Sequence, residues 1–419
     1  MREGKALTEW RSYWPLVLTG LMGTTTTGAH VYSLGVVMKP LAAEYGWSRA
    51  EIAFAITITS GTAMCLLTFV GILVDRLGPR RVALAGVPLT AAMMTLVVFA
   101  GPSIWSWFGI WFIYGLAVML MHPVVYGPAI ASAFNASRGM ALGIGLAGSG
   151  IASLVYPSLT LWLLITFGLG GVYPGLALFT LLTMGPLVLF AFKPPAVHAG
   201  AKASSTIQPG EPPDSAPAWG MTLREAIRNS LFWRIVLTMA ISAMTMSGIN
   251  IHLVSLLTDG GRSTAWAVGI VAVIGPAVLV GRLLGGYLLD RVHARWIAMT
   301  FLLLPALGCI LLVSFTNSFL LCAAAAAFFG LSKGVEGDLL PYALARYFGL
   351  RHFGALYGLA MAIFSGGYAT GPLAAGIIYD LTGSYQGALI GISAALLVAG
   401  LVTVTFPRYP AERAEAQPV

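Results

Sequence analysis

The sequence predicts an all-α membrane protein with twelve transmembrane helices, arranged as two homologous six-helix bundles. Composition is the first observation behind this prediction. Charged residues make up 9% of the 419 residues and apolar residues 58%, whereas soluble globular proteins carry about 25% charged residues. So few charges exclude a soluble protein, and the high hydrophobicity excludes a disordered chain. The three Cys exclude a secreted disulfide scaffold.

Apolar segments long enough to cross a bilayer are the second observation. A spanning helix needs roughly 20 apolar residues. The chain contains twelve such segments, at about 13–38, 50–74, 82–101, 104–132, 138–166, 171–192, 230–257, 265–289, 296–315, 317–345, 353–379 and 384–407. The first segment is too long for the apolar core of a signal peptide and lacks a small-residue cleavage site. We therefore expect it to be a membrane helix.

A polar stretch at 193–229 divides the twelve segments six and six. It is rich in Pro, Ser and Gly, which is typical of a linker. Its end, around 221–230, has the pattern of a short amphipathic helix at the membrane surface. The predicted parts are an N-terminal bundle at 1–192, a linker at 193–229 and a C-terminal bundle at 230–419.

The distribution of Lys and Arg predicts the orientation in the membrane. If the N-terminus lies inside, most of these residues fall on the inside, and the outside holds Lys39, Arg49 and Arg262. Such an excess marks the cytoplasmic side. We expect both termini and the linker to face the cytoplasm, in a multi-pass protein of the cell (inner) membrane. Lys39, near the end of the first span, is expected to snorkel to the interface.

An internal repeat is the third observation. Residues 71–80 and 286–295 share five of ten positions at an offset of 215, and the same offset relates Pro157 to Pro372. The chain therefore contains two homologous halves in parallel orientation. In transporters built this way, the substrate site lies near the bilayer midplane between the repeats.

The first copy of this repeat, GILVDRLGPR, resembles the most recognisable motif of the major facilitator superfamily. The resemblance implies a charge cluster that latches the halves in one conformer. Such a contact forms in one state and breaks in the other. Topology determination by positive charge is the simpler alternative. The residues concerned are Asp75, Arg76 and Arg80, with Asp290 and Arg291 in the second copy.

A narrower resemblance lies in three other segments. Residues 134–150 resemble the segment-five signature of the monocarboxylate transporter family, although the basic pair that precedes Arg138 in that signature is missing. Residues 44–49 and 347–354 resemble bacterial members of that group and the related oxalate/formate exchangers. These resemblances imply transport of a small monocarboxylate or related organic anion.

Four charged residues fall well inside predicted spans, away from their ends: Arg282, Lys333, Glu336 and Asp338. Charge in hydrocarbon is costly, so each is a candidate functional residue. A guanidinium binds a carboxylate bidentately, and the resemblance places the family's substrate-binding Arg at Arg282. The alternative for Arg282 is a structural pair with Asp338 or Glu336.

The other three charges are candidates for coupling or gating. Lys333 and Glu336 are spaced to pair on one helix face, which leaves Asp338 for Arg282 or for carrying a proton. Animal members of the family have a coupling Asp four residues before the Arg, where this chain has Val278. Coupling then requires another titratable group, a proton carried on the substrate, or exchange of a counter-anion.

Polar residues in the spans that line the cavity in this superfamily, or near them, complete the candidate substrate site. A hydrogen bond between helices is the alternative role for each of them. They are His30, Tyr32, His122, Tyr126, Asn250, Tyr342 and Ser365.

Motifs for other functions are missing from the sequence. It contains no Walker loop, His-Glu-x-x-His or Cys-x-x-Cys motif, and the scattered basic residues are unlike a nucleic-acid-binding face. We expect a transporter that is not an enzyme, uses no cofactor or metal, and works as a monomer with a small organic anion and protons or a counter-anion. The alternative is an efflux transporter for hydrophobic or cationic compounds, with Asp338 or Glu336 as the charge partner. The longest loop, about 37 residues, leaves no room for a receptor domain.

Overall fold

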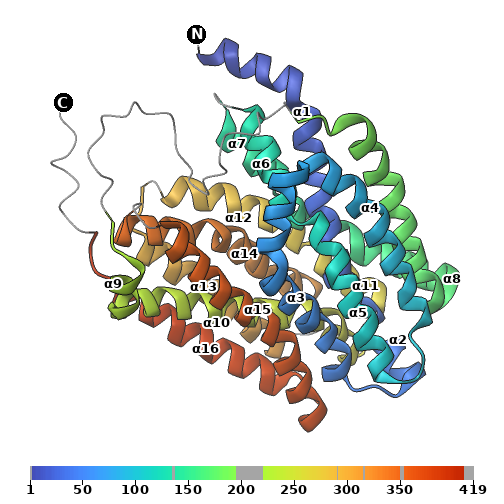
Figure 1. Cartoon of the computed structure of the whole chain (residues 1–419). Coiled ribbons are helices and arrows are strands. Elements are labelled where there is room, and N and C mark those ends of the chain that lie inside the picture. The colour runs from blue at the N-terminus through green and yellow to red at the C-terminus, as the bar shows by residue number, and fades with distance from the viewer. Residues whose placement is uncertain are drawn as a thin grey trace, which may run out of the picture.

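The computed structural model is helical throughout the part of the chain that it describes, apart from turns and one isolated bridge between Gly220 and Gly349. The described residues are 2–134, 137–194, 220–289, 291–314, 317–349 and 353–409. Figure 1 shows long helices packed side by side in a single helical body.

The described part of the first half of the chain forms eight α-helices. They are α1 (Arg2–Thr27), α2 (Ala29–Tyr45), α3 (Arg49–Leu77), α4 (Pro79–Thr95), α5 (Ile104–Val118), α6 (Pro123–Ala133), α7 (Arg138–Gly145) and α8 (Gly148–Pro186). Short 3₁₀ turns at Leu96–Phe99 and Met119–Met121 extend α4 and α5, and a π-helical turn at Leu187–Ala191 extends α8.

Eight more helices form the second half. They are α9 (Leu223–Arg228), α10 (Ser230–Asp259), α11 (Thr264–Ala272), α12 (Ile274–Leu289), α13 (Ala294–Ser314), α14 (Phe319–Phe348), α15 (Phe353–Thr382) and α16 (Gln386–Val404). Helix α9 coincides with the short amphipathic helix that the sequence predicts.

Local sequence explains where several helices begin. Ser48 and Glu51 form a capping box at the start of α3, and Thr222 and Glu225 form another at the start of α9. Each box satisfies two backbone N–H groups that have no partner within the helix. Pro79 occupies the first position of α4, where the N–H that proline lacks is not needed.

Ten helical segments of the described chain are long and apolar enough to cross a membrane. One of them, Met140–Ala191, covers two of the predicted spans. Gly168 separates these two spans because its φ of 71° breaks the helical path inside α8. The predicted span at 13–38 is divided between α1 and α2 at Gly28. The segments are thus consistent with the predicted twelve-helix fold.

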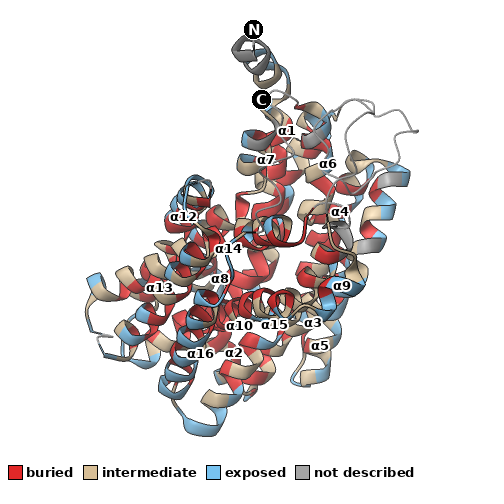
Figure 2. Ribbon diagram, turned by 90° about the vertical axis from the view of Figure 1, so that its left-hand side faces the viewer, coloured by how far each residue is buried: buried red, intermediate tan, exposed pale blue. Residues whose placement is uncertain are grey.

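Two large hydrophobic cores and one small cluster around Ile130 lie inside the helical body, where Figure 2 shows most of the buried residues. The first takes nearly all of its side chains from Leu16 to Phe192, and the second from Ala226 to Phe406. The exceptions are Ile251, which joins the first core, and Val36, which joins the second. Each half therefore packs around its own core, and α2 and α10 interdigitate where the halves meet.

Helices of the two halves also meet at glycines. A Cβ atom on Gly35 of α2 would lie 2.7 Å from the carbonyl oxygen of Ile251 in α10, and one on Gly376 of α15 would lie 2.6 Å from the Cα of Ala50 in α3. Small residues allow backbones to approach closely in membrane helices. The junctions that follow α2, α10 and α15 share one end of the body, which we call the distal end. It lies opposite the N-terminus and α9 (Figure 1).

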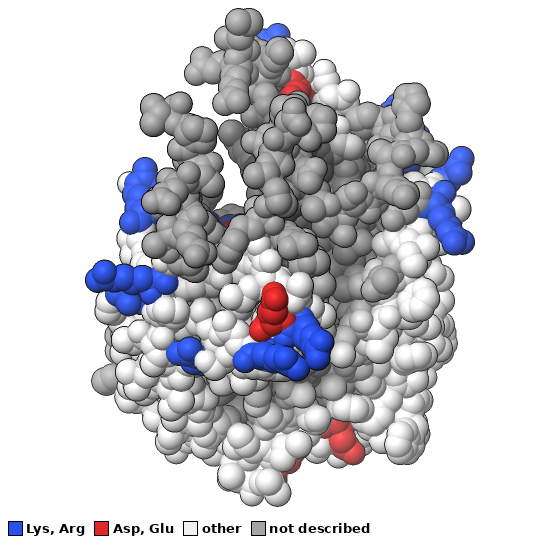
Figure 3. Space-filling model, turned by 60° about the vertical axis from the view of Figure 1, so that its left-hand side comes forward, with Lys and Arg blue, Asp and Glu red and all other residues white. Residues whose placement is uncertain are grey.

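The surface of the body suits a lipid environment. In the face drawn in Figure 3, charged side chains are few, and a broad uncharged area extends below the basic residues. Large apolar side chains such as Trp105, Leu283 and Leu320 are more than three-quarters exposed. Exposed apolar surface of this extent is expected of helices that face lipid.

Candidate functional site

Arg282 and Asp338 face each other from α12 and α14. These helices approach closely because Gly334 has no side chain: a Cβ there would lie 2.6 Å from the backbone nitrogen of Arg282. The Nη2 atom of Arg282 lies 3.6 Å from Oδ1 of Asp338. That distance is beyond a normal N–H···O hydrogen bond, so the pair is a loose one.

Arg282 also reaches the other half of the protein. Its Nη1 atom donates to the carbonyl oxygen of Leu146, between α7 and α8, at 3.5 Å. The side chains of Arg282 and Asp338 are 33% and 34% exposed. The guanidinium therefore lies where the halves meet, within reach of solvent, and its loose contacts leave donors available for an anion.

Lys333 makes a different contact from the predicted pair with Glu336. Its Nζ atom donates to the hydroxyl oxygen of Tyr32 at 2.9 Å and lies 5.2 Å from the centre of that ring. Among the described residues, Lys333 and Glu336 form no ion pair. The spacing allows that pair, but in this conformer Lys333 extends across the interface to α2. Two candidate residues, Lys333 and Tyr32, are thereby brought together from opposite halves.

Glu336 lies inside the second half. Together with Ser242 and Ser332 it lines a small pocket between α10, α13 and α14. One of its carboxylate oxygens is buried and has no hydrogen-bond partner among the described residues. A buried polar atom of this kind is rare and is often functional.

Four other candidate residues have contacts within a single half. His30 lies against the ring of Tyr114, with Nδ1 3.5 Å from its hydroxyl. The ring nitrogen of His122 accepts from the backbone N–H of Val124 and caps α6. The hydroxyl of Tyr126 donates to Met121, and that of Tyr342 donates to the carbonyl oxygen of Leu289. These contacts favour a packing role for the four residues.

The last two substrate candidates lie on α10 and α15. Asn250 is 6% exposed, and its side-chain oxygen has no hydrogen-bond partner in the described part of the chain. It lies beside Gly35, where α10 crosses α2. Ser365 is half-buried in α15. The structure therefore groups Arg282 with Asp338 and Lys333 with Tyr32.

The residues of the repeated motif are described only in part. The side chain of Asp75 and the whole of Asp290 lie outside the described residues. Arg76 is exposed in the last turn of α3. Arg80 donates to the carbonyl oxygen of Leu189 at 2.9 Å, and the Arg291 guanidinium lies 3.7 Å from the ring centre of Tyr287. Each of these two contacts stays within one half, so the latch remains a prediction.

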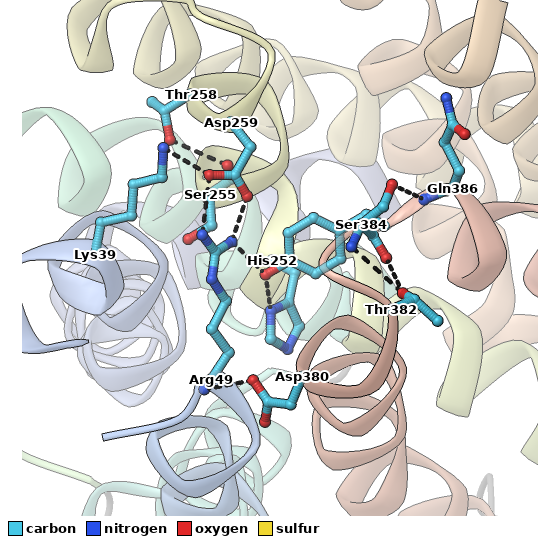
Figure 4. Close-up of polar contacts among 11 residues, drawn as sticks. Lys39, Arg49, His252, Ser255, Thr258, Asp259, Asp380, Thr382, Ser384 and Gln386 are labelled. Carbon is cyan, nitrogen blue, oxygen red and sulfur yellow. Dashed lines mark hydrogen bonds and ion pairs between the residues drawn. The ribbon is translucent and has the colours of Figure 1, made fainter. Parts of the chain in front are cut away.

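A charged cluster at the distal end joins the two halves (Figure 4). Arg49, at the start of α3, forms a bidentate pair with Asp259, at the end of α10, with N–O distances of 2.6 and 2.9 Å. Lys39 of α2 lies 2.7 Å from the same carboxylate. Lys39 therefore pairs with Asp259, and its predicted snorkelling is corrected, because the fold brings the end of α10 beside it.

Asp380 of α15 completes this cluster. Its carboxylate accepts the backbone N–H groups of Arg49 and Ala50 at 3.0 and 2.9 Å. These are unpaired donors of the first turn of α3, where a negative charge also meets the favourable end of the helix dipole. We call Lys39, Arg49, Asp259 and Asp380 the distal charge cluster. It contains two positive and two negative groups and ties α2 and α3 to α10 and α15.

The sequence alone does not predict this cluster. In the sequence, Lys39 and Arg49 are charges on the outer side of predicted spans, and the topology rule gives little weight to the Asp and Glu residues that could pair with them. One feature of the sequence does point to it. Two acids, Asp259 and Asp380, follow the ends of predicted spans on the same outer side of the membrane as these two cations. Acids and cations at one membrane face can pair across helices, but the helix neighbours must be known first.

Comparisons with known proteins agree with this architecture. The pattern of the Major Facilitator Superfamily matches residues 20–331 and 260–419. Monocarboxylate transporter 11 of Homo sapiens is 26% identical over 394 residues, covering 90% of this chain and 79% of that protein. Monocarboxylate transporter 13 of Bos taurus is 24% identical, with coverage of 94% and 89%. The uncharacterized MFS-type transporter YcxA of Bacillus subtilis is also 24% identical, with coverage of 88% of each chain.

Solved structures show the same fold at lower identity. The nucleoside transporter NupG superposes with a TM-score of 0.73 at 12% identity, covering 93% of this chain and 98% of that one. A bacterial homologue of the human lysosomal transporter Spinster, in an inward-facing and unoccupied conformation, gives a TM-score of 0.65 at 16% identity, covering 93% and 94%. The chain therefore belongs to the major facilitator superfamily and is a multi-pass membrane transporter.

Proposed function

We propose that the protein is a secondary transporter that carries a small monocarboxylate or related organic anion across the cell membrane by alternating access. The observation that carries the proposal is the position of Arg282. Its guanidinium lies at the junction of the halves, is one-third exposed, and is held by contacts of 3.5 and 3.6 Å. An incoming carboxylate can form a shorter, bidentate pair with it.

The proposed mechanism uses the competition between the substrate and Asp338. The substrate carboxylate takes the place of the Asp338 carboxylate on Arg282, and the surrounding apolar side chains select for the rest of the molecule. Movement of the bundle at 1–192 against that at 230–419, joined by the linker at 193–229, then exposes the site to the other side. Transport is coupled to protons or to exchange of a counter-anion, since Val278 stands in place of the family's coupling Asp.

The proposed orientation places the N-terminus and the linker in the cytoplasm, so that the distal end faces outward. In that orientation the distal charge cluster closes the outer side, and Arg282 is reached from the cytoplasm. The relatives named monocarboxylate transporters support the substrate class, because the alignments cover 79% and 89% of their lengths. We expect the protein to work as a monomer in the cell inner membrane.

A second candidate function is efflux of hydrophobic or cationic compounds. Glu336 favours it, because one of its carboxylate oxygens is buried without a hydrogen-bond partner among the described residues. A cationic substrate would supply the missing partner. The apolar residues around it, Met239, Phe301 and Leu339, would suit a hydrophobic compound.

Thermal-shift measurements on the purified protein separate these two functions. A ligand that binds the folded state raises the melting temperature. Under the first proposal, one acid from a panel of small carboxylates stabilises the wild type and Arg224→Ala, which alters an exposed Arg of α9, but not Arg282→Ala. Equal stabilisation of all three proteins would contradict the role of Arg282. Stabilisation by lipophilic cations that is lost in Glu336→Gln would favour efflux.

A further inference from the structure

His252 connects the distal charge cluster to the interior of α15. It lies two helical turns before Asp259 on α10 and is 2% exposed. Its Nδ1 atom lies 2.8 Å from the hydroxyl of Tyr385, and its Nε2 atom lies 2.9 Å from the carbonyl oxygen of Pro372 in α15. The same Tyr385 hydroxyl lies 2.8 Å from Nη1 of Arg49. Both nitrogens of the ring are thus engaged, and Figure 4 shows His252 beside Arg49 and Asp259.

The direction of each hydrogen bond follows from the groups involved. A carbonyl oxygen only accepts, so Nε2 of His252 carries a hydrogen and donates to Pro372. In a neutral imidazole, Nδ1 then accepts, and the hydroxyl of Tyr385 is its donor. The hydroxyl oxygen is left free to accept from Arg49, which cannot act as an acceptor. The chain of bonds from Arg49 through Tyr385 to Pro372 is therefore complete only when His252 is neutral.

We propose that His252 is a proton-binding site that controls opening of the distal end. A proton from solvent adds to Nδ1 and makes the ring an imidazolium. No covalent bond of the protein is broken. Nδ1 and Arg49 are then both donors to one hydroxyl oxygen, and the hydroxyl hydrogen of Tyr385 loses its acceptor. Two positive charges also meet at that hydroxyl. Each effect weakens the contact that ties α3 to α10.

The charged groups around the His252 ring determine how strongly its protonation weakens the contact between α3 and α10. Arg49 of α3 contacts the same Tyr385 hydroxyl as His252, and Asp380 of α15 accepts the backbone N–H of Arg49. Asp259 lies on the same helix as His252 and is shared by Arg49 and Lys39. Tyr379 of α15 lies under the Arg49 guanidinium, whose central carbon is 3.7 Å from the ring centre. Once His252 is protonated, the imidazolium attracts the Asp380 carboxylate that holds the first turn of α3, and this competition weakens the interface.

This inference rests on the proposed function, in which the distal end faces outward, and it adds a role for external protons. Acid on the outer side would open the distal end and expose Arg282 to an external anion. Because His252 is buried in the closed state, proton binding and opening are coupled: each favours the other by the same factor.

Distance measurements between spin labels test the proposal in the full-length protein in lipid nanodiscs. Cys65, Cys309 and Cys322 are first replaced by Ser. Labels are then attached at Ala43→Cys on α2 and Ala265→Cys on α11, two exposed positions of opposite halves near the distal end. From pH 8 to pH 6 we expect the ratio of long to short distances to rise about threefold, the change that one proton can drive on a histidine of ordinary affinity.

Variants identify the group that responds. His252→Gln and Tyr385→Phe should lose the pH response, whereas His122→Gln should keep it. A wild type without a response, or a His252→Gln protein that keeps the full response, would overturn the proposal. If His252→Gln does not fold, as judged by its elution profile and melting curve, Tyr385→Phe decides, because it removes only the hydroxyl that links the ring to Arg49.

The two proposals can fail separately, since the distance measurement needs no substrate. If small carboxylates do not bind but the label distances respond to pH through His252, the substrate class is wrong and the proton site stands. If a carboxylate binds through Arg282 but the label distances do not depend on pH, the substrate class stands and the proton site is wrong.

Discussion

Arg49 and Asp259 are 210 residues apart in the chain and form a bidentate ion pair between α3 and α10, with N–O distances of 2.6 and 2.9 Å. The side chain of Arg49 is 10% exposed and that of Asp259 is 27% exposed. A planar guanidinium and a carboxylate in this geometry form one of the stronger polar contacts in proteins. Because the pair joins opposite halves, it stabilises only those conformers in which the distal end is closed.

Arg49→Gln and Asp259→Asn should each weaken the closed distal end by about 1.5–3 kcal/mol, the usual contribution of a hydrogen bond to a charged group. The label distances at Ala43→Cys and Ala265→Cys measure the change, which should appear as a larger fraction of long distances at pH 8. Lys39→Gln is the matched comparison, because Lys39 contacts the same carboxylate but is 37% exposed. Its effect should stay below about 1 kcal/mol. Equal effects of all three substitutions would show that the Arg49–Asp259 pair has no special role in closing the distal end.

The substitution Asp338→Asn should increase the affinity for the transported anion. It removes the charge that competes for Arg282 and keeps the size of the side chain. We expect the dissociation constant to fall about threefold to tenfold, which corresponds to roughly 0.7–1.4 kcal/mol. Titration calorimetry with a carboxylate that stabilises the wild type would measure it. Weaker binding in Asp338→Asn would mean that Asp338 contributes to the site and does not compete for it.

Arg282→Lys should lose most of the affinity for a carboxylate although the charge is retained. An ammonium group does not offer the planar pair of donors that a carboxylate accepts. We expect affinity to fall at least about tenfold, or roughly 1.4 kcal/mol. Arg224→Lys, on the exposed surface of α9, is the control and should bind as the wild type does. Unchanged binding in Arg282→Lys would leave charge alone as the basis of recognition.

Gly376→Ala should disturb the interface between α3 and α15. The added Cβ would lie 2.6 Å from the Cα of Ala50, and overpacking of this kind costs typically about 1–3 kcal/mol. Gly358→Ala, in the same helix, meets nothing within 4 Å and is the matched control. We expect the label distances to lengthen only in Gly376→Ala. A similar response of both variants would indicate a general effect on α15.

His293, between α12 and α13, should make the folded protein less stable as the pH falls. Burial, together with the neighbouring Arg295 and Arg346, lowers the pKa of His293 below its ordinary value. The unfolded chain then binds the proton more readily than the folded protein. The contribution of this group to stability is present above the ordinary pKa, near 6.5, and is lost as the pH falls through the lower folded pKa.

Melting temperatures measured from pH 8 down to pH 5 test this role of His293. His293→Gln should show a smaller decrease than the wild type over the same range, because one of the groups that take up a proton on unfolding has been removed. His122→Gln serves as the comparison among the histidines. An identical pH profile for His293→Gln and the wild type would argue against the prediction.

Much of the architecture follows from local patterns in the chain. The scarcity of charge, the apolar segments and the repeat at 71–80 and 286–295 identify a two-part helical membrane protein, because each span must satisfy its own backbone within the bilayer. The charges within spans also indicate Arg282 and Asp338, since their cost in hydrocarbon does not depend on knowing the neighbours. The structure places these two residues in contact.

The partners of the other charges could not be derived in this way. Spacing along one helix allows Lys333 to pair with Glu336, but the long Lys333 side chain reaches Tyr32 of α2 in the other half. Likewise, Arg49 and Asp259 lie on helices whose adjacency depends on how the halves close. Composition and periodicity are properties of each segment. Which charges meet depends on the rotation and relative position of whole helices, and that is determined by packing across the protein.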